Sequence, residues 1–126
     1  MRIVLDASFL IDFIRGDPTA VTRLARIFGD GDEPILCGPP VVEVETGLRP
    51  GEEPAFDAIV AAAEFVQAGP GAARDAGRWR RAARRRGATL SLPDAMIAAE
   101  AVHDGASVLT RNVREFALTP VEVLTY

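Results

Sequence analysis

The sequence predicts an α/β domain of three layers, in which helices cover both faces of a central, mostly parallel sheet of four to five strands. The first observation is that short apolar segments alternate with longer segments of helical periodicity along the whole chain. Strands separated by such helices pair in parallel through right-handed crossovers. The second observation is size. The 126 residues, 48% of them apolar, suit a single domain with a real core, which we expect to span residues 1–126.

The first half of the chain is predicted to hold two strands and four helices. Ser8 is expected to cap the first helix, Pro18 opens the second, and Gly29 ends it. In chain order, we expect a strand over residues 2–5, helices over 9–15 and 17–28, a strand over 34–37, and helices over 39–48 and 53–63.

The second half is predicted to hold three strands, two helices and a helical turn. In chain order, we expect a strand over residues 64–67, helices over 70–86 and 91–103, a strand over 106–109, a turn over 112–116 and a strand over 121–124. Ligands of parallel sheets bind beyond the carboxyl ends of the strands. Asp6 and the segment 110–112, which follow two of the strands, are therefore expected at the edge that carries the site.

Composition excludes several classes of protein. The chain has no lysine, which rules out a Walker-type phosphate loop and a Schiff-base mechanism. The single Cys37 cannot form an internal disulfide, and we expect it to be a small buried residue. No apolar run approaches the roughly 18 residues of a membrane helix, and the chain opens on a strand rather than a signal peptide. We expect a cytoplasmic protein with no membrane partner.

Four acidic residues adjoin apolar elements: Asp6, Glu43, Asp94 and Glu115. Ionised carboxylates beside a buried element are costly unless something pairs with them. Two carboxylates about 4 Å apart repel by roughly 4 kcal/mol at an effective dielectric near 20, so a cluster of these acids would need a cation. Oxygen ligands favour Mg²⁺ or Mn²⁺, whereas one histidine and one cysteine cannot make the usual zinc site.

Each acid also has a purely structural interpretation. Asp6 could cap the first helix, and Glu43 could be a solvated helix residue. Asp94 stands three residues after Ser91, in the spacing of a capping box, and Glu115 could play the same part in the short turn that follows Asn112. A capping role does not exclude a metal role, because the helix dipole keeps a carboxylate in the first turn ionised.

Four segments of the chain together resemble the motifs of PIN domains. Residues 1–8 are similar to the opening strand that delivers an aspartate and a small hydroxylated pair. Residues 42–47 resemble the second motif, a helical glutamate with a glycine four residues on. Residues 92–101 and 108–116 look like the third and fourth motifs. Order and spacing hold over nearly the whole chain, and its size and motif variants are most similar to the VapC class of toxins.

The resemblance implies a PIN-like fold and a set of site residues. Asp6, Glu43 and Asp94 would be the metal-binding acids, with Glu115 as the further catalytic acid. Glu45 is an alternative to Glu43, although the glycine spacing favours Glu43.

Three polar residues would support the acids. Asn112 stands where many members of the family have an acid, which leaves the fourth ligand and any second metal open. Ser8 and Thr110 could orient water on the metal, or they could be capping or turn hydroxyls.

The resemblance also implies an activity and partners. The chain would be an endoribonuclease that depends on Mg²⁺ or Mn²⁺, the toxin of a type II toxin–antitoxin module, with RNA as substrate, a cognate antitoxin protein and a homodimeric state. The alternative is an interaction module of the same fold with weakened catalysis. A receiver domain would need a lysine, and a haloacid-type phosphatase would need a second acid two residues after Asp6, where Ser8 stands.

An arginine-rich helix offers a surface for RNA, although the net charge of −4 argues against a generic nucleic-acid binder. Arg78, Arg81 and Arg85 share a helical stripe that could contact phosphates or could be a solvated face paired with acids. Trp79 could stack on a base or pack against the core. His103 lies near a helix end, where it favours the dipole.

Overall fold

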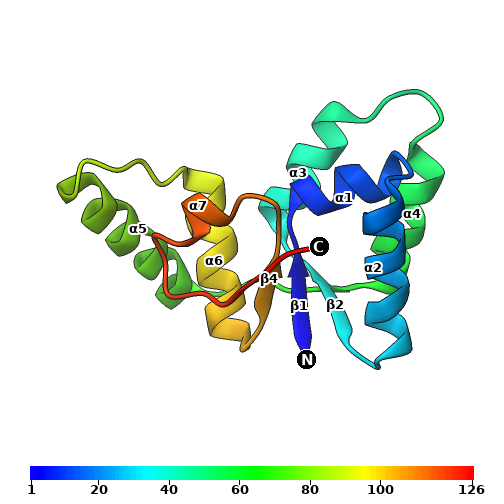
Figure 1. The fold of residues 1–126 in the computed structure, drawn as a ribbon. Helices are drawn as coiled ribbons and strands as arrows, with labels where there is room; N and C mark the ends of the chain where they lie inside the picture. Colours follow the sequence, from blue (N-terminus) through cyan, green and yellow to red (C-terminus); the bar gives the residue numbers. More distant parts are fainter.

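The computed structural model describes residues 1–126 and contains five strands and seven helices (Figure 1). The strands are β1 (Arg2–Leu5), β2 (Glu33–Leu36), β3 (Glu64–Phe65), β4 (Ser107–Leu109) and β5 (Val123–Leu124). The helices are α1 (Ala7–Ile14), α2 (Pro18–Gly29), α3 (Gly38–Gly47), α4 (Glu53–Ala62), α5 (Pro70–Arg85), α6 (Leu92–Asp104) and α7 (Val113–Phe116). None of these helices is long and apolar enough to cross a membrane.

The sheet is parallel throughout, in the order β3-β2-β1-β4-β5. This confirms the predicted fold class. The chain builds from β1 outward to β2 and β3, and then returns to the other side of β1 with β4 and β5. The order therefore reverses between β1 and β4, whose last residues, Leu5 and Leu109, are paired. The crevice beyond such a reversal is the usual ligand site of open α/β sheets.

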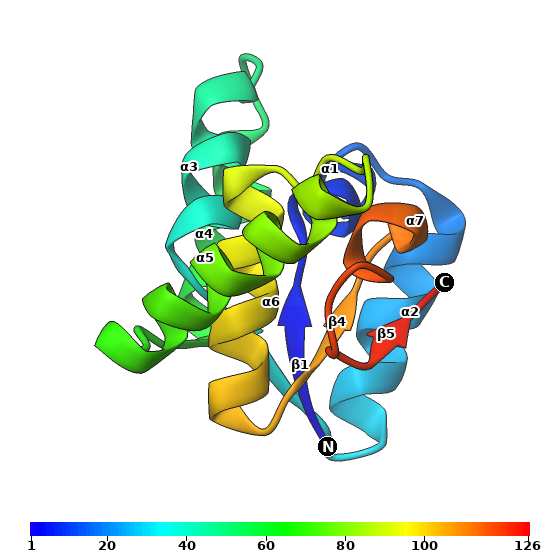
Figure 2. The same ribbon diagram turned by 90° about the vertical axis from the view of Figure 1, so that its left-hand side faces the viewer.

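Two apolar cores lie on the two faces of the sheet. On one face, Ile3 and Leu5 of β1 pack with residues from α1 to α4. On the other face, Val4 packs with residues of α6 and α7, and α5 packs against the outer side of α6 (Figures 1 and 2). The alternation along β1 follows from the two-residue period of a strand. Cys37 is fully buried in the second core, as predicted, and burial raises the pKa of its thiol.

Some element boundaries differ from the sequence-based expectations. Helix α1 begins at Ala7, so Asp6 rather than Ser8 occupies the N-cap position, and no side chain caps the helix. Ser8 instead lies in the first turn, where its hydroxyl bonds to residues of the site. Strands β3 and β5 each have two residues and are shorter than predicted. Ser91 does cap α6, as its hydroxyl accepts a hydrogen bond from the Asp94 N–H at 3.3 Å.

The pair of helices α5 and α6 packs through small residues. Buried alanines of both helices form a separate cluster, and Trp79 of α5 is half-buried against it and against the core beneath. Trp79 is therefore a packing residue. His103 of α6 reaches Asp75 of α5 at 2.7 Å, and a side chain on Gly71 would come within 3.3 Å of its ring. His103 therefore connects α5 and α6 through Asp75.

Candidate active site

Asp6 and Thr110 meet at the carboxyl end of the sheet because β1 and β4 are parallel neighbours. The register of the strands ends with Leu5 opposite Leu109, so the next residue of each strand lies at the same edge. The Asp6 N–H continues the ladder by donating to the Leu109 carbonyl at 3.1 Å. The predicted site-bearing edge is thus built by strand pairing alone.

Two hydroxyl groups hold the carboxylate of Asp6, which is only 4% exposed. Thr110, fully buried, donates to Oδ2 at 2.7 Å, and Ser8 donates to the same oxygen at 3.0 Å. Thr110 also accepts a hydrogen bond from the Asn112 N–H at 2.8 Å, which fixes its hydroxyl. These hydrogen bonds fix Asp6, Ser8 and Thr110 relative to one another. The Asp6 carboxylate is thus bound by neutral donors.

Asp94 enters the site from the first turn of α6 and is 8% exposed. The Asn112 amide donates to its Oδ2 at 2.9 Å. Burial, followed by the neighbouring carboxylate of Glu115 and the charge of Asp6, raises the pKa of Asp94 to about 8. Its position in the first turn of a helix opposes this shift only in part. Without a bound cation, the raised pKa favours the neutral form of the Asp94 carboxyl.

Glu115 lies beside Asp94 but keeps its charge. Its Oε1 accepts the Ser91 N–H at 2.8 Å, and its Oε2 accepts the Asn112 amide at 2.8 Å. The hydrogen bond with Asp94, reinforced by Asn112 and Ser91, lowers the pKa of Glu115 to about 2. The two pKa shifts have opposite directions because Asp94 is the more buried of the two carboxyls and so favours its neutral form. The Asn112 amide bridges the pair, as a cation would.

Glu43 faces the same cluster from α3. Burial, and then the negative charges of Asp6 and Glu115, raise the pKa of its carboxyl. Glu43 also lines a groove of about 480 Å³ between α3, β3 and α6, whereas Glu45 does not. The charge interactions place Glu43 near Asp6 and Glu115. Its side chain is also exposed, which agrees with the structural interpretation of Glu43 as a solvated helix residue.

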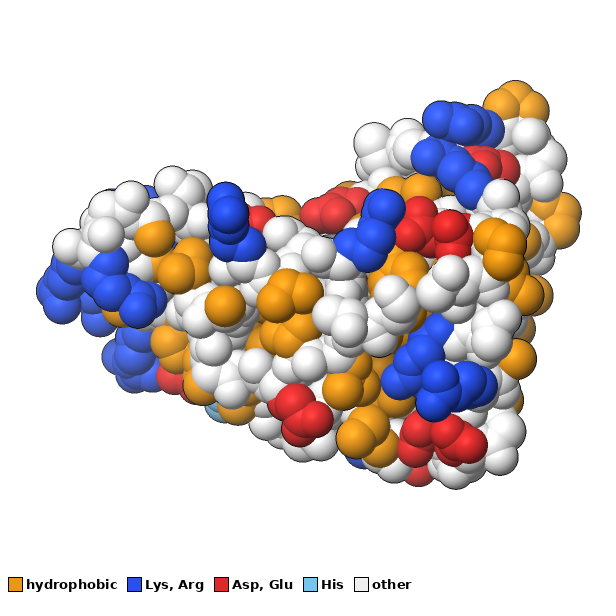
Figure 3. Space-filling model, viewed as in Figure 1, with side chains coloured by type: hydrophobic (Ala, Val, Ile, Leu, Met, Phe, Trp, Pro, Cys, Tyr) orange, Lys and Arg blue, Asp and Glu red, His pale blue; other side chains and the backbone are white.

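No arginine neutralises these four acids, since none of the ion pairs of the protein includes any of them. Arg111, whose backbone N–H donates to Ser8, has its guanidinium bound to Asp12 at 3.1 Å. Figure 3 shows acidic side chains along the hollowed upper edge of the molecule. Carboxylate, hydroxyl and amide oxygens are the donors that a hard divalent cation prefers. No three acids, histidines or cysteines are close enough to hold one together in this conformation.

The arginines of α5 divide into two kinds. Arg78 is engaged by Asp75 at 2.6 Å, and Arg80 donates to the Leu90 carbonyl at 3.1 Å. Arg81 and Arg85 are exposed and form no ion pair. The interpretation of this helix face as paired with acids therefore describes Arg78. It does not describe Arg81 and Arg85, which have no acidic partner.

Some site contacts carried no signal in the sequence. Ser91 was expected as a cap, yet its backbone N–H also anchors Glu115 across 24 positions of the chain. Asn112 stands at the N-cap of α7 but makes no capping bond. Its amide donates to Asp94 and Glu115 instead. Tyr126 donates to Asp12 at 2.6 Å beside the site, and no motif pointed to it.

Comparison with known proteins finds similarity over nearly the whole chain. The family model of the PIN domain matches residues 3–121. The chain is 31% identical to "Ribonuclease VapC19" of Mycobacterium tuberculosis over 117 residues, which cover 93% of this chain and 94% of that protein. VapBC2 from Rickettsia felis, solved with a promoter DNA fragment, has a TM-score of 0.86 at 16% identity and covers 100% of this chain and 99% of its own. DNA-bound VapBC from Salmonella typhimurium has a TM-score of 0.82 at 22% identity, over 99% and 98% of the two chains.

Proposed function

The chain belongs to the PIN domain family, and on that premise we propose that it is an endoribonuclease dependent on Mg²⁺ or Mn²⁺, the toxin of a toxin–antitoxin pair. The observation that carries the proposal is that Asp6, Asp94 and Glu115 lie at one edge of the sheet and interact electrostatically with Glu43, while none of the four is in an ion pair. Its relative in Mycobacterium tuberculosis is called a ribonuclease. Acids held together without a counter-ion are explained by a cation that binds there.

Asp6, Glu43 and Asp94 would hold the cation, with Glu115 as a further acid. When bound, a divalent cation supplies an activated water and stabilises charge on the phosphate. The chain provides the alignment: Ser8 and Thr110 fix one oxygen of Asp6.

Asn112 aligns the other two acids, Asp94 and Glu115. Its amide keeps Asp94 and Glu115 at a set spacing. The proton on Asp94 must leave before that carboxylate can act as a charged ligand, so cation binding and deprotonation are coupled.

RNA would reach the acids over the arginine-rich side of α5. Arg81 and Arg85 are free to contact phosphates, whereas Arg78 would first have to leave Asp75. We therefore rank Arg81 and Arg85 above Arg78 as RNA-binding residues. Arginine suits this role because its planar guanidinium binds phosphate oxygens in pairs.

The partners would be a cognate antitoxin and a second copy of the chain. Toxin–antitoxin complexes are among the solved structures with the same fold. The groove beside Glu43 exposes the apolar side chains Val42, Phe65, Leu92 and Met96. Exposed apolar groups grouped in this way are typical of protein interfaces.

Cleavage of RNA by protein freed of antitoxin tests the proposal. We expect cleavage with Mg²⁺ or Mn²⁺ and none with excess EDTA, and Asp94→Asn should be inactive under both conditions. Cleavage that continues unchanged in EDTA would contradict metal dependence. Absence of cleavage under every condition, with RNA still bound, would favour the interaction module, in which the Asn112 amide takes the place of the cation.

A further inference from the structure

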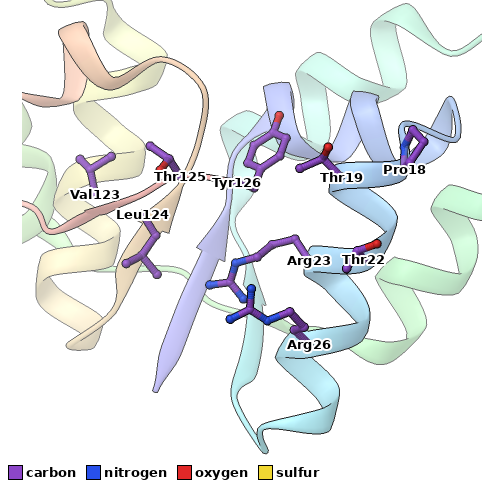
Figure 4. Close-up of a pocket in the computed structure, with 9 residues that line it drawn as sticks. All are labelled: Pro18, Thr19, Thr22, Arg23, Arg26, Val123, Leu124, Thr125 and Tyr126. Carbon is purple, nitrogen blue, oxygen red and sulfur yellow. The ribbon is translucent and has the colours of Figure 1, made fainter.

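A second basic surface lies away from α5, in a groove between α2 and the end of the chain (Figure 4). The groove has a volume of about 720 Å³. One wall is the face of α2 that carries Thr19, Thr22, Arg23 and Arg26, and the other is formed by β5 and the residues after it. Figure 3 shows its basic side chains as a group over α2, separate from the group over α5.

The two arginines of this groove have no acidic partner. Arg23 and Arg26 are three positions apart and so share one face of the helix. In Figure 4 their guanidinium groups extend side by side into the groove. Neither is in an ion pair, and Asp32, which follows the end of α2, is instead paired with the amino terminus at 3.1 Å. Two adjacent cations without a counter-ion favour an anionic ligand.

A chain of contacts connects this groove with the carboxylate site. Tyr126 stands at the groove and donates to Asp12 at 2.6 Å. Asp12 also binds the Arg111 guanidinium, and the Arg111 N–H donates to Ser8, which donates to Asp6. The groove therefore starts beside the acids and runs along α2 away from them. An extended ligand that passes the acids can continue into it.

The lining chemistry decides between two anionic ligands. Arginine guanidiniums and threonine hydroxyls bind phosphate oxygens, and the exposed part of an aromatic ring such as Tyr126 offers a stacking surface for a base. An acidic peptide that adds a strand to the sheet would find only a short edge, because β5 has two residues. The surface therefore fits a nucleic-acid strand better than a peptide strand.

We propose that the groove between α2 and β5 holds a phosphate of single-stranded RNA outside the bond that is cut, bound by Arg23 and Arg26. The assignment rests on the proposed ribonuclease function and names a subsite of it. The subsite would give affinity for longer RNA without taking part in the chemistry. It would act in addition to the contacts of α5, on the other side of the acids.

The test separates binding from cleavage. Asp94→Asn protein, free of antitoxin, is titrated with a labelled single-stranded RNA of about 12 nucleotides, within the range of one strand-binding site. Arg23→Gln with Arg26→Gln should weaken binding about tenfold and lower the salt slope by up to about 0.7 for each phosphate that the variant no longer binds. Arg15→Gln with Arg49→Gln, at the ends of α1 and α3, removes two exposed charges outside both basic surfaces and is the matched control.

The outcomes are distinct. A fall in affinity in the groove double variant, with little change in Arg15→Gln with Arg49→Gln, supports the subsite even if the wild type cuts no RNA and the proposed activity fails. Equal falls in the groove variants and the control mean a general charge effect and overturn it. Unchanged RNA binding, together with reduced binding of a polyglutamate peptide, overturns it in favour of an acidic protein segment. In active protein, the double variant should raise KM for long RNA and leave kcat unchanged.

Discussion

The two edges of the sheet differ in whether their acidic side chains are paired with an arginine. At the amino-terminal edge, Arg2 of β1 bonds to Asp104 at 2.8 and 3.2 Å, to Glu64 at 3.0 Å and to Glu33. These acids come from α6, β3 and β2. One guanidinium thus links four elements. Its hydrogen bonds with Asp104 and then Glu64 raise the pKa of Arg2 above its ordinary value.

At the carboxyl edge, four acids from as many elements also converge, but no arginine joins them. Hydroxyls serve Asp6, and an amide serves Asp94 and Glu115. Burial, and then the neighbouring Glu115, raise the pKa of Asp94. The acids at the amino-terminal edge thus have a cation within the chain, whereas the acids at the carboxyl edge have none, as the proposed cation site requires.

The largest expected effect is on catalysis. Asp94→Asn keeps the shape of the side chain and removes its charge, and it should lower kcat by more than about 100-fold, the upper range for residues that only orient a ligand. The metal-free variant should be as stable as the wild type at neutral pH, where Asp94 favours its uncharged form, and more stable above about pH 8, where the wild-type carboxyl becomes charged. An active variant of reduced stability would mean that Asp94 is only a helix residue. Cleavage assays and melting in EDTA measure the two effects.

A smaller decrease is expected when a supporting hydroxyl is removed. Thr110→Val leaves Oδ2 of Asp6 with one donor fewer and the Asn112 N–H without its acceptor, so cleavage should fall by about 10- to 100-fold. Thr119→Val is the matched control, because the Thr119 hydroxyl donates to the Phe116 carbonyl at 2.7 Å away from the acids. Equal activities of the two variants would remove Thr110 from the site.

The pH dependence of stability should also differ between the edges. A folded-state pKa raised to about 8 means that Asp94 contributes stability at low pH, which is lost as the pH rises from about 4 through 8. Glu115 acts in the opposite sense, but only below its ordinary pKa, so it does not oppose this trend. In EDTA, the melting temperature of the wild type should fall between pH 5 and 8, and Asp94→Asn should flatten that fall. Identical pH profiles would contradict the raised pKa of Asp94.

Removal of Arg2 should affect stability alone. Arg2→Gln leaves three acids without their cation, so the melting temperature should drop, and cleavage at a temperature where the variant is folded should stay the same. The drop should shrink at high salt, because salt screens the remaining acids from one another. A cleavage defect in the folded variant would show that the amino-terminal edge is not purely structural.

The smallest effect is on RNA affinity through α5. Arg81→Gln and Arg85→Gln should each lower the salt slope of RNA binding by up to about 0.7, the value for one contact to a single strand. Arg78→Gln should change it less, since Asp75 already holds that guanidinium. Equal slopes for all three variants and the wild type would make α5 a solvated or protein-binding face.

Much of the carboxyl edge could be predicted from the sequence, whereas little of the amino-terminal edge could. The position of Asp6 beside Thr110 follows from parallel strands and the rule for their carboxyl ends, which need only local patterns. The cap of α6 by Ser91 was predictable for the same reason. Ser8 was misassigned as a cap because the sequence shows the hydroxyl but not where the helix begins, and the helix already includes Ala7.

The remaining contacts depend on packing between distant segments. Arg2 meets Asp104 across 102 positions and Tyr126 meets Asp12 across 114, and no periodicity encodes such pairs. The bridging role of Asn112 requires α7 to sit against the start of α6. Only the folded chain brings these residues together.

The central claim is that the carboxyl edge is completed by a divalent cation, and thermal melting with Mg²⁺ tests it most directly. Mg²⁺ at a hundredfold excess over its Kd should stabilise the wild type by about 2.7 kcal/mol, measured against the same protein in EDTA. Asp94→Asn should lose most of that increase, whereas Arg2→Gln should keep it despite a lower starting temperature. Equal responses to Mg²⁺ in the wild type and Asp94→Asn would contradict the claim.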